Sequence, residues 1–246
     1  MTKQIQLYLA ILLLLGLVSA CSQDEGDPEP RKVELTPIDQ YTSIDKVSGT
    51  IYIKDLPGSL GNTHASGHTP VFFDLETHQI INPYEDENTL LELPEEQQKS
   101  KAWDLGFTGV YNSLLAINKG TDSRSPGYGG QGQGAILVMD AQFDEVDEAP
   151  SEETFEAFMQ VQATSGWENY PPGHKGWFFY SLESHIMRPV SGITILLRTP
   201  DGKYAKVEMT SIYLGNPEKP TINSPAPYFT FRYFLQEDGS RNLKTR

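Results

Sequence analysis

The chain has 246 residues, of which 38% are hydrophobic, and its 33 acidic against 19 basic side chains give a net charge of −14. A negative field of this size repels phosphate backbones, so composition argues against nucleic acid as a partner. With Cys21 as its one cysteine the chain has no internal disulfide. A hydrophobic core must therefore hold the fold, and about 200 residues suffice for one.

The first twenty residues have the features of a bacterial export signal. Lys3 is followed by an apolar run over residues 7–18 and then by small residues. This run is shorter than the roughly 20 residues that a comfortable bilayer span needs. Val18-Ser19-Ala20-Cys21 looks like a lipobox, in which the cysteine receives a diacylglycerol and residues 1–20 are removed. We predict lipidation of Cys21; an uncleaved anchor or a plain secretory signal is the alternative.

Residues 21–46 are expected to be an acidic, flexible tether. Asp, Glu and Pro are frequent near its start, and apolar residues are few there. Ser22-Gln23-Asp24-Glu25 resembles the acidic signals that send some bacterial lipoproteins to the outer face of the outer membrane. We therefore expect a protein that is lipid-anchored in the outer membrane and exposed at the cell surface.

From residue 47 onward, short β-branched or aromatic runs alternate with Gly, Pro, Asn and Asp, which is typical of an all-β fold. We predict one antiparallel, β-sandwich-like domain over residues 47–246, with at most one or two short helices. The nine predicted strands are Thr50–Lys54, Val71–Leu75, Trp103–Thr108, Leu114–Asn118, Ala135–Asp140, Trp177–Ser181, Ile193–Thr199, Tyr204–Tyr213 and Tyr228–Leu235.

The best helix candidate runs from Glu152 to about Gln162. Ser151 is a plausible N-cap, and Phe155, Phe158, Met159 and Gln162 follow helical spacing.

The turn Pro200-Asp201-Gly202 predicts a hairpin between the strands on either side of it. In its second strand Lys206, Glu208 and Thr210 alternate with apolar residues, so we expect one face of that strand to be wet.

Four blocks in order resemble the HmuY-like haem-binding lipoproteins, namely Trp103–Phe107, Ile117–Thr121 with the glycine-rich stretch 127–135, Ile193–Tyr213, and Tyr228–Tyr233. The resemblance extends from about Thr50 to Leu235. It implies an all-β protein that captures non-covalent haem b from the environment or from host haemoproteins. It also implies delivery to a TonB-dependent outer-membrane receptor, by binding rather than catalysis.

In that family two His or Met side chains from separate loops coordinate the iron. The resemblance makes Met159, with either His185 or Met187, the candidate ligand pair, and His174 a further candidate. In an extended segment His185 and Met187 would share a face, and Pro189 favours that geometry. Each also has an ordinary interpretation: Met159 and Met187 as core residues, and His185 as a surface or hydrogen-bonded histidine.

Other residues are candidates for the haem site because they lie near these ligand candidates in the sequence. Trp167, Tyr170 and Trp177 are candidate walls for a flat ring, and Lys175 and Arg188 are candidate partners of its propionates.

Other site chemistries find little support in the sequence. His64 and His68 lie four apart, with His78 further on, but nearby Gly and Pro disfavour a helix and the glutamate of zinc proteases is missing. The glycine-rich stretch lacks a phosphate-loop ending, and no Gly-x-Ser-x-Gly motif occurs. We therefore expect no catalytic residues and no metal other than haem iron. The alternative function is a surface glycan- or protein-binding accessory lipoprotein without haem.

Overall fold

The structure, a computed structural model, describes residues 31–60, 68–86, 89–158, 162–163, 166–167 and 176–245. Within these ranges most elements are strands, and the two α-helices are short, α2 (Glu95–Gln98) and α3 (Glu152–Phe158). The predicted all-β class is confirmed. Neither of these two helices has the length and apolar character needed to cross a bilayer.

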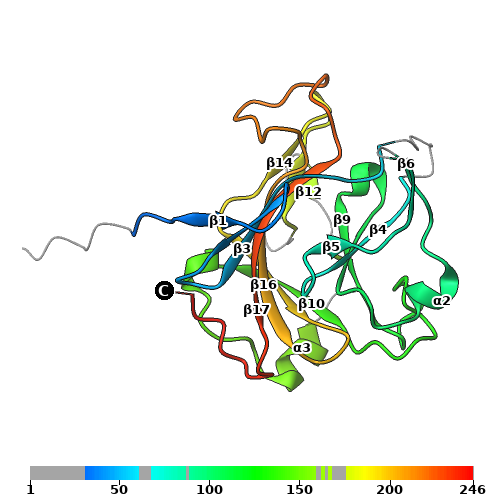
Figure 1. The fold of residues 1–246 in the computed structure, drawn as a ribbon, viewed down its shortest axis with the longest axis vertical. Coiled ribbons are helices and arrows are strands. Elements are labelled where there is room, and N and C mark those ends of the chain that lie inside the picture. Colours follow the sequence, from blue (N-terminus) through cyan, green and yellow to red (C-terminus); the bar gives the residue numbers. More distant parts are fainter. Residues whose placement is uncertain are drawn as a thin grey trace, which may run out of the picture. The chain divides into compact units, whose positions relative to one another are not determined.

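The larger sheet is antiparallel throughout and runs in the order β1-β2-β3-β17-β16-β15-β10 (Figure 1). Its long central strands β3, β17 and β16 come from the two ends of the described chain, so the sheet joins distant segments of sequence. The seven strands are β1 (Leu35–Pro37), β2 (Thr42–Asp45), β3 (Thr50–Pro57), β17 (Tyr228–Gln236), β16 (Tyr204–Ser211), β15 (Ile193–Arg198) and β10 (Ala135–Asp140).

The smaller sheet has five antiparallel strands in the order β11-β9-β8-β4-β5. These are β11 (Gln162–Ala163), β9 (Leu114–Ile117), β8 (Leu105–Thr108), β4 (Val71–Asp74) and β5 (Gln79–Ile80). Two further small sheets are formed by β12 (Gly166–Trp167), β13 (Phe178–Tyr180) and β14 (Met187–Pro189), and by β6 (Tyr84–Asp86) and β7 (Thr89–Leu90). The pair β12–β13 is parallel.

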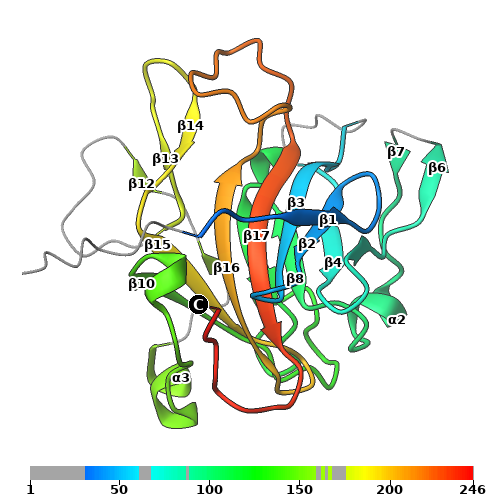
Figure 2. The same ribbon diagram turned by 60° about the vertical axis from the view of Figure 1, so that its left-hand side comes forward.

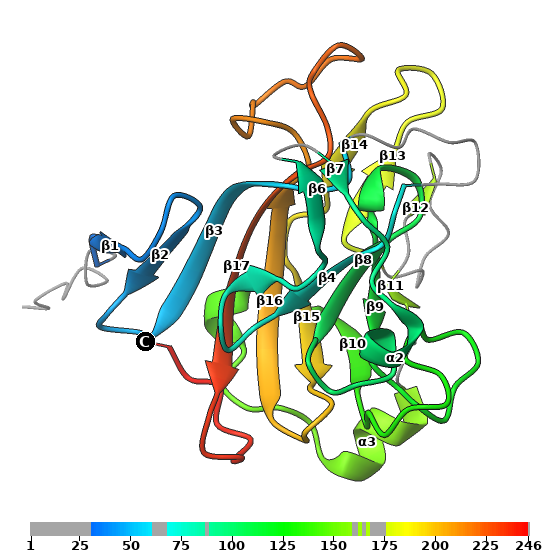
Figure 3. The ribbon, with the colours of Figure 1, turned by 45° about the vertical axis from the view of Figure 1, so that its right-hand side comes forward.

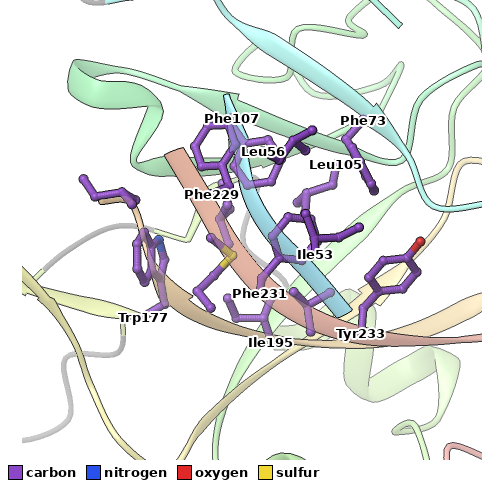
Figure 4. Close-up of a cluster of buried hydrophobic side chains, with 14 of the residues drawn as sticks. Ile53, Leu56, Phe73, Leu105, Phe107, Trp177, Ile195, Phe229, Phe231 and Tyr233 are labelled. Atoms are coloured by element: carbon purple, nitrogen blue, oxygen red, sulfur yellow. The ribbon is translucent and has the colours of Figure 1, made fainter. Parts of the chain in front are cut away.

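The core lies between the two larger sheets, as expected for a sandwich. Phe107 of β8 stacks on Phe229 of β17, with ring centroids 4.1 Å apart. Phe73 of β4 meets Phe231 edge to face at 5.6 Å. Figure 4 shows these rings converging from both sheets. The alternation of buried residues in β17 follows directly from its aromatic sequence, because every second side chain faces the smaller sheet.

The ordered fold begins earlier than the predicted boundary at residue 47. β1 and β2 lie within the expected tether, and β2 pairs with β3 along its whole length. Asp39 Oδ1 accepts the backbone N–H of Tyr41 (2.7 Å) and Thr42 (2.8 Å). Asp45 is buried and accepts the hydroxyl of Ser48 at 2.6 Å. These acidic residues, which indicate a solvated tether by composition, instead cap turns.

All nine predicted strands are present, and the helix is shorter than predicted. Ser151 Oγ accepts the N–H of Thr154 at 3.3 Å, which confirms the N-cap. The structure describes α3 over Glu152–Phe158, and Gln162, its predicted end, belongs to β11, which pairs with β9. Pairing with a neighbouring strand therefore overrides the helical periodicity at this end.

The expected wet face of β16 is wrong at Lys206. Its side chain is fully buried, and Nζ donates to Phe143 O, Val146 O and Thr245 Oγ1, each at 2.9 Å. The 3-10 turn η2 (Phe143–Glu145) and the C-terminal segment cover this part of the sheet. The ammonium is thus satisfied by acceptors from segments remote in sequence.

The glycine-rich stretch has a packing role. The fully buried Asn118 donates through Nδ2 to Ser100 O at 2.7 Å. A Cβ at Gly127 or Gly132 would lie 2.2 or 2.3 Å from Asn118 Oδ1. Only glycine permits this approach, which brings the two parts of one sequence block together around the side chain of Asn118.

Candidate functional site

The segment with the donor candidates His185 and Met187 forms the turn and second strand of the β13–β14 hairpin. Ser181 N–H donates to Ile186 O (3.0 Å), and His185 N–H donates to Ser181 O (2.9 Å). His185 has a left-handed φ of 56°, so the segment is not extended there. The predicted common face of His185 and Met187 is therefore wrong: His185 is exposed, whereas Met187 is 6% exposed.

A largely apolar hollow of about 300 Å³ lies against this hairpin, and we call it the Tyr180 hollow. This volume is at the lower end of the range for small-ligand sites. The hollow is bounded by the 3-10 turn η1 (Val110–Asn112), by the start of β9 and by both strands of the hairpin. Its lining residues are Val110, Tyr111, Ser113, Leu114, Phe178, Tyr180 and Met187.

The η1 wall of the Tyr180 hollow is built on a strained backbone. Tyr111 and Asn112 both have left-handed φ values, 52° and 49°. Asn112 is fully buried, and its side chain donates to Thr69 O (2.9 Å) and Phe107 O (3.2 Å) and accepts Ser59 N–H (3.0 Å). Such conformations persist where the surroundings over-determine them, and they gather at binding sites.

This anchored turn presents two apolar side chains outward. Val110 is 56% and Tyr111 38% exposed. The backbone N–H of Tyr111 donates to Nδ1 of His68 at 2.9 Å, and their rings lie 5.1 Å apart. Burial lowers the pKa of His68, which keeps Nδ1 available as an acceptor. The turn is thus fixed by His68 at Tyr111 and by the hydrogen bonds of the Asn112 side chain.

His185 contacts Tyr180 across the hairpin. The Tyr180 hydroxyl and His185 Nδ1 are 2.7 Å apart. Tyr180 lies opposite Met187 in the strand register and lines the Tyr180 hollow. His185 borders a separate space of about 30 Å³, which shares Tyr111 with the Tyr180 hollow.

A second hollow of about 360 Å³ lies on the other side of Met187, and we call it the Trp177 hollow. Arg188 and Pro189 border it, together with the end of β16 and the loop that follows. Figures 2 and 3 show the β13–β14 hairpin standing beside that loop. Because Met187 lines both hollows, its side chain is part of the wall between them.

The same wall is braced by two hydrogen bonds. The indole N–H of Trp177 donates to Ser113 O at 2.8 Å. The Met187 N–H donates to the Tyr213 hydroxyl at 2.9 Å. Burial raises the pKa of that hydroxyl, so it remains neutral and able to accept. Trp177, a predicted wall for a ring, is therefore a buried support that faces the second hollow.

Met187 lines the Tyr180 hollow, His185 contacts the lining residue Tyr180, and Arg188 is exposed beside the Trp177 hollow. The other candidates, Cys21, His64, Met159, Tyr170, His174 and Lys175, lie outside the described residues, as does the side chain of Trp167. Among described residues, no group of three or more His, Cys, Asp or Glu is arranged to hold a metal ion. His68 and His78 contact different partners, Tyr111 and Tyr233.

Sequence reasoning missed Tyr180, Tyr111 and Leu114 as lining residues. In the sequence Tyr180 and Leu114 are ordinary members of predicted strands, and Tyr111 lies in a connection. Their one local signal is the alternation within Trp177–Ser181, which places Phe178 and Tyr180 on one face. The wall itself arises only when three separate segments meet.

The described residues fit haem as one side of a site. Imidazole nitrogen and thioether sulfur are both ligands of haem iron, and the hollow supplies an apolar surface. Two donors only two residues apart on one hairpin cannot lie on opposite faces of a flat ring. If haem bound here, either His185 or Met187 could hold its iron, and a further protein ligand would come from another segment.

No protein-family model and no curated protein sequence matches this chain. Among solved structures, a provisionally assigned lipoprotein from Bacteroides fragilis is similar at 16% identity and a TM-score of 0.41, over 78% of this chain and 93% of that chain.

Two further solved structures each share 14% identity with this chain at a TM-score of 0.37. One is the apo HmuY analog of Tannerella forsythia, aligned over 85% of this chain and 99% of its own. The other is a provisionally assigned HmuY-like haem-binding protein from Bacteroides vulgatus, aligned over 83% of this chain and 97% of its own.

Proposed function

We propose that this chain is a lipid-anchored haem-binding protein that captures haem b and passes it to a TonB-dependent receptor in the outer membrane. One observation supports the proposal: an apolar hollow with aromatic walls is lined by Met187 and by Tyr180, and the Tyr180 hydroxyl contacts the imidazole of His185. Its role is binding and transfer, with no chemical step.

In this proposal each part of the site has a distinct task. The Tyr180 hollow takes an apolar face of the ring, with Leu114 and Phe178 in its wall. His185 or Met187 supplies one axial donor, and Met159 supplies the other. Arg188, exposed beside the Trp177 hollow, offers a cation to a propionate. Bound haem would contribute the iron whose two axial positions these donors fill.

The anchoring part of the proposal rests on residues outside the described ranges. Lipidation of Cys21, removal of residues 1–20 and the acidic signal after the cysteine would place the protein at the outer face of the outer membrane. A surface protease applied to intact cells tests this. Degradation before lysis supports surface exposure, whereas resistance until lysis contradicts it.

Haem binding is tested by titrating hemin into the mature chain, residues 21–246, carrying Cys21→Ser so that it stays in solution. We expect a Soret band with low-spin features that changes in Met159→Ala and in His185→Ala or Met187→Ala. Absence of any spectral change in both oxidation states contradicts the proposal. Binding to a glycan array or a surface protein without haem would favour the alternative function.

A further inference from the structure

We infer that Tyr180 is a positioning residue for His185: its hydroxyl holds Nδ1 of the imidazole and so leaves Nε2 as the atom that reaches the iron. This inference rests on the proposed haem-binding function. It is carried by the 2.7 Å contact between the Tyr180 hydroxyl and His185 Nδ1. It also selects His185 over Met187 as the donor from this hairpin.

The backbone around His185 is arranged to make this contact. The turn is closed by His185 N–H to Ser181 O (2.9 Å) and by Ser184 N–H to Ser181 Oγ (3.2 Å). The left-handed φ of 56° at His185 takes its side chain out of the strand alternation. The imidazole thereby meets a residue of the opposite strand, while Met187, two residues on, remains in the wall.

A tyrosine hydroxyl suits this task because it can both donate and accept a hydrogen bond. With Nε2 protonated, the phenol donates to Nδ1. When Nε2 binds iron it must be unprotonated, so Nδ1 carries the proton and donates to the phenol oxygen. Metal-bound histidines commonly use such a partner on the second nitrogen, which fixes the tautomer and the ring orientation.

The position of Tyr180 links this contact to the hollow. Its ring lines the Tyr180 hollow, and the centroids of its ring and the His185 imidazole are 6.1 Å apart. Phenylalanine at this position would keep the ring and lose only the hydroxyl. Tyr180→Phe therefore separates positioning of the imidazole from packing of the wall.

The test is a hemin titration of the mature chain with Tyr180→Phe. We expect about tenfold weaker binding and a smaller low-spin fraction, since loss of such a second partner costs about 10–100-fold in metal affinity. Tyr128→Phe is the matched control, because Tyr128 is 52% exposed on the glycine-rich stretch and lines neither hollow. This control should bind as the wild type does.

A double-mutant cycle and a measurement without haem complete the design. In the His185→Ala background, Tyr180→Phe should have no further effect, because the two residues act as a unit. In the haem-free protein the ¹⁵N shifts of the His185 ring should change in Tyr180→Phe, with those of His78 as an internal reference.

The outcomes separate the two proposals. If the wild type binds hemin and Tyr180→Phe binds equally well, or if the effects of the two substitutions add, the positioning role is overturned and the function stands. Unchanged His185 ¹⁵N shifts in Tyr180→Phe also overturn it. If the wild type does not bind hemin, the proposed function fails and the inference falls with it.

Discussion

Two histidines of this chain make the same contact in two different regions. Nδ1 of His78 lies 2.5 Å from the Tyr233 hydroxyl, and Nδ1 of His185 lies 2.7 Å from the Tyr180 hydroxyl. Both histidines have a left-handed φ, 64° and 56°. The His78 pair joins residues 155 apart in sequence and the His185 pair residues five apart, and the surroundings of the two pairs differ.

The His78 pair belongs to the core. Tyr233 is fully buried, its hydroxyl also donates to Leu75 O at 2.9 Å, and burial is the main cause of the raised pKa of that hydroxyl. The pair therefore ties the turn between β4 and β5 to the central strand β17. The His185 pair stands at the rim of a hollow, where the imidazole is exposed. A similar contact thus holds a turn of the core in one region and lies beside the Tyr180 hollow in the other.

The largest expected effect concerns the anchor of the hollow itself. Asn112→Ala should lower the free energy of unfolding by about 3 kcal/mol, because it leaves buried backbone groups of Thr69, Phe107 and Ser59 without partners. Chemical denaturation measures this. A loss below about 0.5 kcal/mol would show that the hollow region is not rigidly anchored on this side.

Tyr233→Phe should cost about 1.5 kcal/mol, because the buried hydroxyl bridges His78 and Leu75. Hemin affinity should stay unchanged, since the pair lines neither hollow. Denaturation and titration of the same sample check both statements. A weakened affinity with unchanged stability would reverse the assignment of the two pairs.

The core region also predicts a dependence on pH through Asp104. Burial is the main cause that raises the pKa of Asp104 to about 7, although its carboxylate accepts Leu75 N–H at 2.9 Å. The folded state therefore binds a proton more tightly than the unfolded state, whose Asp pKa is near 3.9. Between these values the contribution of Asp104 to stability falls as pH rises, by at most about 1.4 kcal/mol per pH unit.

Asp104→Asn keeps an acceptor for Leu75 N–H and removes the titration. The difference in unfolding free energy between wild type and variant should therefore change between about pH 4 and pH 7. As pH falls, the free energy of unfolding of the wild type should rise relative to that of the variant. Denaturation midpoints at several pH values measure it. A constant difference across that range would contradict the prediction.

The smallest effect is expected for Tyr180→Phe on stability. Its hydroxyl contacts an exposed imidazole, so the free energy of unfolding should change by less than about 0.5 kcal/mol. Thermal or chemical denaturation tests this beside Tyr233→Phe. Equal losses in the two variants would erase the distinction between the core pair and the rim pair.

Much of the fold could be predicted from local chemistry. The alternation of large residues in Tyr228–Tyr233 correctly predicted a strand with one buried face. Ser151 was also correctly predicted as the N-cap of the helix. At Pro200-Asp201-Gly202 the turn closes through Thr199 N–H to Lys203 O at 2.8 Å, with φ 89° at Gly202. These features depend on a few neighbouring residues, so the local sequence is enough to predict them.

Predictions failed where composition did not show how a polar side chain is bonded. Residues 21–46 are expected to be a tether, but Asp39 and Asp45 within them cap turns through donors two or three residues away. Lys206 indicated a wet face and instead lies under η2 and the C-terminal segment. In each case a polar side chain found its partners within the fold, and composition records the side chain but not those partners.

The sequence by itself determined the all-β class and the nine main strands. Only the tertiary structure decided that Met187 is buried in the wall of the Tyr180 hollow and that Tyr180 contacts His185. The physical reason is that strand formation responds to periodicity and turn residues along the chain. The Tyr180 hollow forms where η1, β9 and the β13–β14 hairpin meet, and that meeting depends on the packing of the whole sandwich.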